Sequence, residues 1–432
     1  MILRVVVLVV FLVVASAAPA AAHNVTAGAD LRIAQTIAGT ELTVVIKGTS
    51  RVPGPLRIGV VAFQPVGDLP ISLEVRSVED GRTVTGVARA APEPQYTPLQ
   101  VARTGPHELR LRAGNEVAVL PFRVLVDRGS AGDFVIYGGL FVAGLLMVGG
   151  LLTGALSRRG PAMALAAGAT AAVTVAVMVV VAEPILPPPS PDGAAPTAQT
   201  PAAGRPFAQA RVATVPERPS AGQEFTLRVD LVDGSTGRPV DDLVLHHEAL
   251  VHVVVTSQDG RFFRHLHPLR TAPGRLEVRL RAERGGRYLA HAELEREDSG
   301  GQLLAGDFRV EGADGEGSPD AGDFATGRWD VGAEPPAGVV PRVQPAAPVA
   351  GRPATIELDP SGAVRPWLGM AGHLLVRSQN GAFLGHVHEM GAPGNRRLRF
   401  TFTFPEPGRY FAWVQYALRD RIVTVPFTIE VS

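Results

Sequence analysis

Two stretches of the chain share one pattern, which decides how the C-terminal part folds. Residues 247–268 read HEALVHVVVTSQDGRFFRHLHP, and residues 368–389 read LGMAGHLLVRSQNGAFLGHVHE. The chain has 11 histidines, and three of them recur in these stretches at a constant offset of 121 residues. They are His252, His265 and His267 in the first copy, and His373, His386 and His388 in the second. This spacing indicates an internal repeat.

Each copy carries a strong β-hairpin signal at its centre, Asp259-Gly260 in the first and Asn380-Gly381 in the second. Such dipeptides favour a two-residue type I′ turn. Counting back along both strands from this turn places His252 opposite His267, and the second copy gives the same pairing. Because side chains alternate along a strand, all three histidines of a copy are predicted to lie on one face of their hairpin.

Three imidazoles on one hairpin face are close enough to share one metal ion, since directly opposite residues have Cβ atoms about 5 Å apart. Imidazole ligands suit copper, zinc, nickel and iron, and a thioether ligand shifts the choice toward copper. We therefore expect a metal site in each copy, with copper first and zinc as the alternative. Further candidate ligands, chosen by strand parity or by position on a later strand, are Met390 in the second copy and His246, Glu248, His291 and Glu293 in the first.

The same histidines have a reading without any metal. Imidazoles that face one another on a sheet can hydrogen-bond to each other or to backbone groups, and a hairpin that uses histidine for packing would also repeat. Both alternatives stay open at the level of sequence.

Composition limits the function. A length of 432 residues suggests about three domains. The 41 basic and 41 acidic residues cancel, so there is no basic field that would attract nucleic acid. The chain has no cysteine, which excludes disulfides, thiolate zinc sites and thiol nucleophiles. The compartment must therefore be inferred from targeting signals.

The N-terminus resembles a secretory signal peptide over residues 1–22, with an apolar run and small residues before a predicted cleavage after Ala22. Cleavage there would make His23 the first residue of the mature protein. Its imidazole and the free α-amine could then bind one metal ion together, so His23 is a further candidate ligand.

Two uncharged runs, residues 134–156 and 161–182, are each long enough to cross a bilayer as a helix. The loop between them, residues 157–160, contains two arginines, which places it in the cytoplasm by the positive-inside rule. Both flanking parts of the chain are then outside the cytoplasm, in agreement with the signal peptide. We expect a two-pass membrane anchor.

The remaining sequence consists of short apolar runs separated by Gly, Pro and Asp, which is typical of β-sandwiches. The predicted fold is mainly β, with three immunoglobulin-like or cupredoxin-like β-sandwich domains plus a two-helix transmembrane hairpin. The predicted segments outside the membrane are an N-terminal sandwich at 23–130, a Pro/Ala linker at 183–206, a first repeat at 207–311, a linker at 312–341 and a second repeat at 342–432.

The two histidine stretches, each followed by a Gly-Arg-Tyr strand, resemble secreted bacterial YtkA-like domains over about 200 residues. That resemblance implies an immunoglobulin-like fold and a link to metal homeostasis, although the second copy has Glu389 where Pro268 follows the paired histidines in the first. The overall layout is also similar to the two-helix copper subunit of particulate methane monooxygenase. That second likeness concerns architecture alone, because its paired histidines belong to the N-terminal domain.

Together these features predict a membrane-anchored extracytoplasmic protein that binds or delivers copper without catalysis. We expect open, solvent-facing imidazole sites that exchange the ion with another envelope protein. One alternative is a cell-surface interaction or spacer protein without metal. Another, less favoured, is a metal-dependent oxidase or hydrolase.

Overall fold

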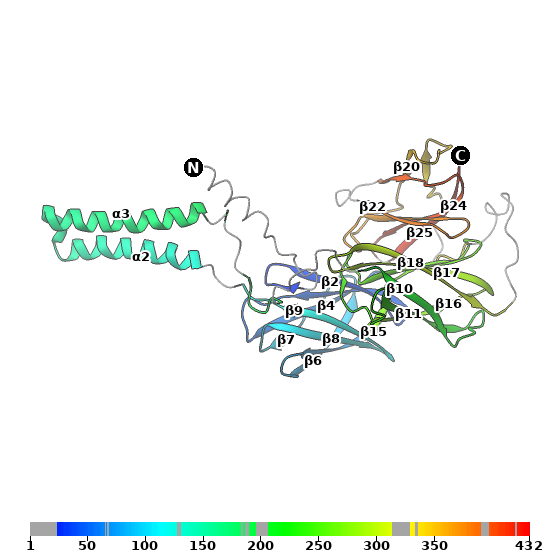
Figure 1. The fold of residues 1–432 in the computed structure, drawn as a ribbon, viewed down its shortest axis with the longest axis horizontal. Helices are drawn as coiled ribbons and strands as arrows, with labels where there is room; N and C mark the ends of the chain where they lie inside the picture. The colour runs from blue at the N-terminus through cyan, green and yellow to red at the C-terminus, as the bar shows by residue number, and fades with distance from the viewer. Residues whose placement is uncertain are drawn as a thin grey trace.

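The computed structural model is mainly β, with one pair of long helices set apart from the rest (Figure 1). It describes residues 24–64, 66, 69–127, 131–182, 185, 190–195, 206–312, 329–332, 336–389, 397–419 and 421–432. The predicted signal peptide, His23 and Met390 lie outside the described residues. The predicted fold class is confirmed by the sheets described below.

The N-terminal domain is a folded-over sheet that encloses its own core. Its strands are β1 (Asn24–Val25), β2 (Asp30–Ile37), β3 (Thr40–Lys47), β4 (Gly54–Ala62), β5 (Pro70–Ser77), β6 (Thr83–Ala91), β7 (Thr97–Val101), β8 (Gly105–Ala113) and β9 (Glu116–Val124). They hydrogen-bond in the order β1-β9-β8-β5-β6-β4-β3-β2, with β7 beside β4. Only two residue pairs join β4 to β6. The sheet bends at this weak seam, and side chains from both halves fill one apolar core.

Helices α2 (Ala131–Leu152) and α3 (Arg159–Ala182) form an antiparallel pair, joined through the short 3-10 helix η1 (Ala155–Ser157). Both are long and apolar enough to cross a membrane. The first helix ends earlier than the uncharged run in the sequence because Gly154 takes a left-handed conformation, with φ 69°, and starts the turn. A Cβ on Gly139 would lie 2.9 Å from the Ala172 carbonyl oxygen, so this small residue lets the helices pack closely.

The first repeat is a two-sheet β-sandwich. Its strands are β10 (Ala208–Val215), β11 (Glu224–Asp233), β12 (Leu243–Val244), β13 (Val251–Ser257), β14 (Phe263–Leu266), β15 (Leu269–Ala272), β16 (Arg275–Arg281), β17 (Gly286–Arg296) and β18 (Gly300–Val310). One sheet has the order β10-β11-β16-β15, and the other has the order β12-β17-β13-β14 with β18 beside β17. The odd-numbered valines of β13, at positions 251, 253 and 255, point into the sandwich core.

The second repeat copies this plan. Its strands are β19 (Arg342–Gln344), β20 (Pro353–Leu358), β21 (Gly372–Ser378), β22 (Leu384–Glu389), β23 (Leu398–Thr403), β24 (Gly408–Ala417) and β25 (Ile422–Val431). They form sheets of order β19-β20-β23 and β22-β21-β24-β25. Leu374 and Val376 of β21 enter its core, which leaves His373, Leu375 and Arg377 on the opposite face.

The two repeats pack against each other through the faces that carry the histidines. Val254 of the first repeat meets Leu375 and Trp413 of the second in one buried apolar cluster. Phe263 stacks on Trp413 with ring centroids 4.6 Å apart. Strands β13 and β21 are therefore buried on both faces, one in their own sandwich and one between the sandwiches.

The N-terminal domain closes one end of this interface. Phe63 and Val61 pack with Trp367 and Leu368 of the second repeat and with Ala249 of the first. The backbone joins too, because the Ala34 amide donates to the Glu248 carbonyl oxygen at 2.6 Å. All three β-domains therefore meet around the histidine-bearing faces.

Candidate metal centre

The two hairpins place their histidines as the sequence predicted. His265 pairs with Val254 across the first hairpin, and His373 pairs with His388 across the second. In each copy, one ligand nitrogen per histidine lies within 4.8 Å of the other two. We call His252, His265 and His267 triad 1, and His373, His386 and His388 triad 2.

The predicted turn type was wrong although the register was right. A type I′ turn needs positive φ at both central residues, but only Gly260 has it in the first copy, with φ 74°. The loop is instead closed by the pair Ser257 and Phe262, and the Gly260 amide donates to the Ser257 carbonyl oxygen at 3.0 Å. The Ser257 hydroxyl also accepts from the Phe262 amide at 2.9 Å. A four-residue loop of this kind keeps the same cross-strand pairs as a two-residue loop.

The two triads form one cluster across the interface between the repeats. The His386 ring lies 5.2 Å from the His265 ring and 5.5 Å from the His252 ring, measured between centroids. His373 lies 6.1 Å from His265. Six imidazoles from sequence-distant hairpins are thus adjacent.

Triad 1 holds its rings with an acceptor on the outer nitrogen of each. His252 Nε2 lies 2.9 Å from the His246 carbonyl oxygen, and His265 Nδ1 lies 2.9 Å from Gln415 Oε1. His267 Nδ1 lies 2.6 Å from Glu41 Oε1 of the N-terminal domain, although neither atom has the direction of an ideal hydrogen bond. A carbonyl, amide or carboxylate oxygen accepts, so the proton of each neutral ring belongs on this outer nitrogen.

The inner nitrogens of triad 1 then carry lone pairs that point at one another. His252 Nδ1 lies 3.1 Å from both His265 Nε2 and His267 Nε2. Three lone pairs with no proton between them repel each other, and a cation placed among them would remove this repulsion. Tetrahedral ligation with bonds of about 2.0–2.1 Å puts ligand nitrogens about 3.3 Å apart, close to the spacing seen here.

Triad 2 repeats this arrangement with different partners. His373 Nε2 lies 3.2 Å from the Trp367 carbonyl oxygen, and His386 Nδ1 lies 2.7 Å from Glu293 Oε2 of the first repeat. Their other nitrogens, His373 Nδ1 and His386 Nε2, are 3.2 Å apart. The buried Nε2 of His388 has no hydrogen-bond partner. These inner nitrogens also fit a metal ion.

Burial and mutual repulsion make both triads poor sites for protons. Burial first, and then neighbouring imidazoles, hold the pKa of His252, His265 and His373 well below the ordinary value of 6.5. The same causes lower the pKa of His388 to about 2. Burial, the largest single cause, would raise the pKa of Glu293, but the hydrogen bond to His386 and the nearby His386, His246 and His247 rings together outweigh it, so the net shift of this pKa is downward. The imidazoles of His252, His265, His373 and His388 are therefore neutral, which is the form that binds metals.

The expectation of open, solvent-facing sites was wrong. His252 and His267 are each 1% exposed, and His373 is fully buried. The sequence held a signal for this, because Val254 and Leu375 share the histidine face of their strands while the valines and leucines beside them fill the other. A strand that is apolar on both faces indicates burial on both faces.

Other predicted ligands take other places. His246 contributes its carbonyl oxygen to His252. Glu248 lies outside both triads and pairs with Arg32 of the N-terminal domain at 2.7 Å. His291 is also outside the triads, with Nε2 3.1 Å from the Gly381 carbonyl oxygen.

Sequence reasoning missed several residues that surround the triads. Glu41 and Gln415 contact triad 1 from other domains, and neither lies in the repeated stretches. His247 was overlooked although its ring lies 3.8 Å from the His388 ring. Counting from Gly-Arg-Tyr at 286–288 and 408–410, an offset of 122 residues, would have paired the predicted candidate Glu293 with Gln415.

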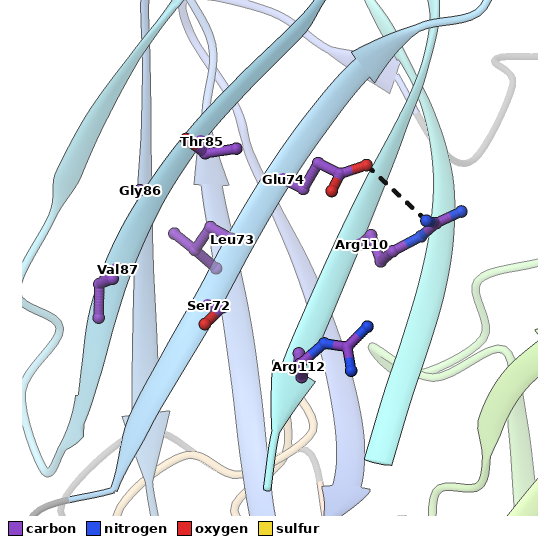
Figure 2. A pocket seen from close by; sticks show the side chains of 8 residues that line it. All are labelled: Ser72, Leu73, Glu74, Thr85, Gly86, Val87, Arg110 and Arg112. Carbon is purple, nitrogen blue, oxygen red and sulfur yellow. Dashed lines mark ion pairs between the residues drawn. The ribbon is translucent and has the colours of Figure 1, made fainter. Parts of the chain in front are cut away.

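A separate hollow lies on the N-terminal domain, on the outer face of β5, β6 and β8 (Figure 2). Glu74 and Arg110 line it and form a long ion pair, with 3.8 Å between Oε1 and Nη1. None of its lining residues is a histidine. It does not belong to the metal centre.

Comparisons with known proteins support the repeat but name no function. Residues 208–312 and 346–432 match the model of a domain of unknown function, DUF8832. No curated protein matches the chain. The likeness to YtkA-like domains and to the methane monooxygenase subunit stays a prediction.

Similar solved structures superpose only weakly. The chicken CNTN1 FN1-FN3 domains are 8% identical, with 89% of this chain and 98% of that chain covered and a TM-score of 0.17. Red sea bream transglutaminase is 11% identical, with 52% and 31% covered and a TM-score of 0.17. Trypsin-activated alpha-2-macroglobulin from Escherichia coli is 11% identical, with 88% and 23% covered and a TM-score of 0.18. Scores this low carry no argument about function.

Proposed function

We propose that this protein is a membrane-anchored, extracytoplasmic copper-binding protein that holds one ion in each histidine triad. The observation that carries the proposal is the set of outer acceptors in triad 1. His246, Gln415 and Glu41 each present an oxygen to an outer ring nitrogen. This is the outer-shell arrangement that fixes the tautomer and orientation of metal-ligating histidines.

Charge favours copper in its monovalent state. Imidazole binds a metal in its neutral form, and each triad has one nearby carboxylate, Glu41 for triad 1 and Glu293 for triad 2. One monovalent ion per triad would balance one carboxylate, whereas a divalent ion would leave a buried net positive charge. Uncompensated charge is costly in an interior. Copper(I) therefore fits better than zinc, which is the alternative.

The rest of the molecule supports a role at a membrane surface. Helices α2 and α3 would anchor the chain as a two-pass hairpin, with the arginine-containing loop in the cytoplasm and the β-domains outside. The described residues of the two helical spans carry their charges only near the ends, at Asp133 and Arg159. The hairpin is then an anchor, and exchange of the ion with another envelope protein takes place at the β-domains.

The test is metal stoichiometry on the full-length protein in detergent micelles, because Glu41 and the repeats must stay together. The protein is equilibrated with silver(I), a redox-inert stand-in for copper(I), and with copper(I) under reductant, then passed through a desalting column and analysed by mass spectrometry for metal. We expect two equivalents. Pairwise substitutions, His265→Asn with His267→Asn or His386→Asn with His388→Asn, should each leave one equivalent.

His107→Asn serves as the matched control. His107 is buried in the N-terminal domain, with Nδ1 3.0 Å from the Gly105 carbonyl oxygen, so its loss also removes a buried histidine. The control should keep two equivalents. Absence of bound metal in the wild-type protein would overturn the proposal and favour a surface module without metal. Two equivalents in both pairwise variants would also overturn it, because the metal would then be bound outside the triads. Circular dichroism of every variant verifies that it is folded.

A further inference from the structure

The two triads are covered by equivalent turns that differ in chemistry. Residues 246–249 and 367–370 each form a turn closed by a bridge between its first and last residues. The central residues of both turns have positive φ, 47° at His247 and 54° at Leu368. The first turn reads HHEA and the second reads WLGM.

The first turn reaches triad 2 of the other repeat, and the second turn lies between the triads, with Trp367 5.0 Å from the His373 ring of triad 2. Trp367 of the second repeat lies 5.7 Å from the His265 ring and 6.1 Å from the His267 ring of triad 1. His247 of the first repeat lies 3.8 Å from the His388 ring of triad 2. Triad 1 therefore has an aromatic, apolar cover, and triad 2 has the His247 ring beside it in addition to Trp367.

The cover of triad 1 is sealed, whereas the cover of triad 2 reaches the surface. Trp367 is 2% exposed, Leu368 is fully buried, and both pack on Phe63 and Val61 of the N-terminal domain. His246 and His247 are half-buried, as is His388 beneath them. Among the described residues, it is on this side that a metal ion arriving from outside meets histidine nitrogens.

The paired rings form a continuous path between surface and centre. His246 and His247 are 3.9 Å apart between ring centroids, and His247 continues to His388. The His246 ring also lies 6.2 Å from His252 of triad 1. Neither His246 nor His247 is a member of a triad. Histidine side chains that lie beside the triads without belonging to them are suited to binding a metal ion transiently.

We infer that His246 and His247 form the entry port through which copper(I) reaches and leaves the triads. The inference rests on the proposed function, because a port requires ions to bind within. An incoming ion exchanges its carrier ligand for a nitrogen of this pair and then for His388. The pair lowers the barrier to exchange and adds nothing to the final coordination, so it should change rates without changing affinity.

The test follows transfer of copper(I) from its bicinchoninate complex to the full-length protein by loss of the visible absorbance. His247→Leu keeps a bulky cover and copies the residue found at Leu368, which shows that leucine is accepted at this φ. His247→Asn opens the cover and also tolerates positive φ. Glu248→Gln changes the same turn without removing a histidine and is the matched control.

Both His247 variants should load and release copper at least about tenfold more slowly, with two equivalents bound and an unchanged dissociation constant. The control should match the wild-type protein. Unchanged rates in both variants would overturn the port. Slower transfer in His247→Leu with faster transfer in His247→Asn would also overturn it, since the pair would then be a steric cover alone. If the wild-type protein took up no copper(I), that result would instead contradict the proposed function itself.

Discussion

Triad 1 and triad 2 come from two copies of one hairpin, yet they sit in different surroundings. Both keep three inner nitrogens and an acceptor behind the first histidine, which is the His246 carbonyl oxygen in one and the Trp367 carbonyl oxygen in the other. They differ in their covers and in the groups behind their paired histidines. The comparison teaches that the hairpin fixes a set of ligands, while the neighbouring domains determine charge and access.

The largest effect should be that of pH on the free energy of unfolding. It tests whether burial in the two triads lowers the histidine pKa values to the same extent. The pKa of His252, His265 and His373 is well below 6.5 in the folded chain and returns to about 6.5 on unfolding. Between these values the unfolded state binds more protons. The free energy of unfolding of the metal-free protein should therefore be constant above pH 6.5. It should fall below that pH by about 1.4 kcal/mol per pH unit for each such histidine.

Melting temperatures from circular dichroism between pH 5 and 8, with a chelator present, check this dependence. Both pairwise triad variants should show a weaker dependence on pH than the wild-type protein. An undiminished dependence in either variant would mean that the triad it removes is not the source of the effect.

Smaller effects should distinguish the carboxylates behind the two triads. Glu41→Gln should weaken metal binding at triad 1, and Glu293→Gln should weaken it at triad 2, each by about tenfold to a hundredfold. The reason is that each carboxylate orients a ligating ring and raises its basicity. Competition with a chelator of known affinity would resolve one weakened and one unchanged equivalent in each variant.

Glu277→Gln is the control for these substitutions, because Glu277 pairs with Arg228 on the sheet that faces away from the repeat interface. It should leave both equivalents unchanged. If Glu41→Gln weakened both triads to the same extent, the separate assignment of the two carboxylates would be wrong.

The smallest effect is the difference in stability loss between alanine substitutions in the two hairpin turns. A Cβ on Gly260 would lie 2.5 Å from Cγ of the Phe411 ring, which belongs to the second repeat. A Cβ on Gly381 would instead contact the flexible end of the Leu289 side chain, which belongs to the first repeat. Both glycines have positive φ, so both replacements strain the backbone, and Gly260→Ala should lower the free energy of unfolding by about a further 1–3 kcal/mol through overpacking. Gly381→Ala should cost about 1–2 kcal/mol from its positive φ alone.

Melting temperatures of the two glycine variants, measured side by side, decide the order. A larger loss in Gly381→Ala would mean that the Leu289 side chain cannot move aside, and that the two turns are packed more alike than their neighbours indicate.

Much of the candidate site could be predicted from local pattern. Strand alternation and the Asp-Gly and Asn-Gly dipeptides were enough to place the three histidines of each copy on one face, although the turn was of another type. The wrong turn type did not change the predicted register, because the predicted two-residue loop and the observed four-residue loop both place Ser257 opposite Phe262. Glu41, behind triad 1, could not be predicted, since it lies more than 200 residues from His267 in the chain.

The sequence by itself determined the repeat, the hairpin register, the two apolar helices and the β-rich fold, because each depends on neighbours within one strand or helix. Only the tertiary structure decided that the two histidine faces meet and that they are buried. It also decided that His265 and His386 each form a hydrogen bond with a residue of the opposite repeat. The reason is physical. Parity along a strand fixes which side chains share a face, but what covers that face depends on the shapes of surfaces far apart in the chain.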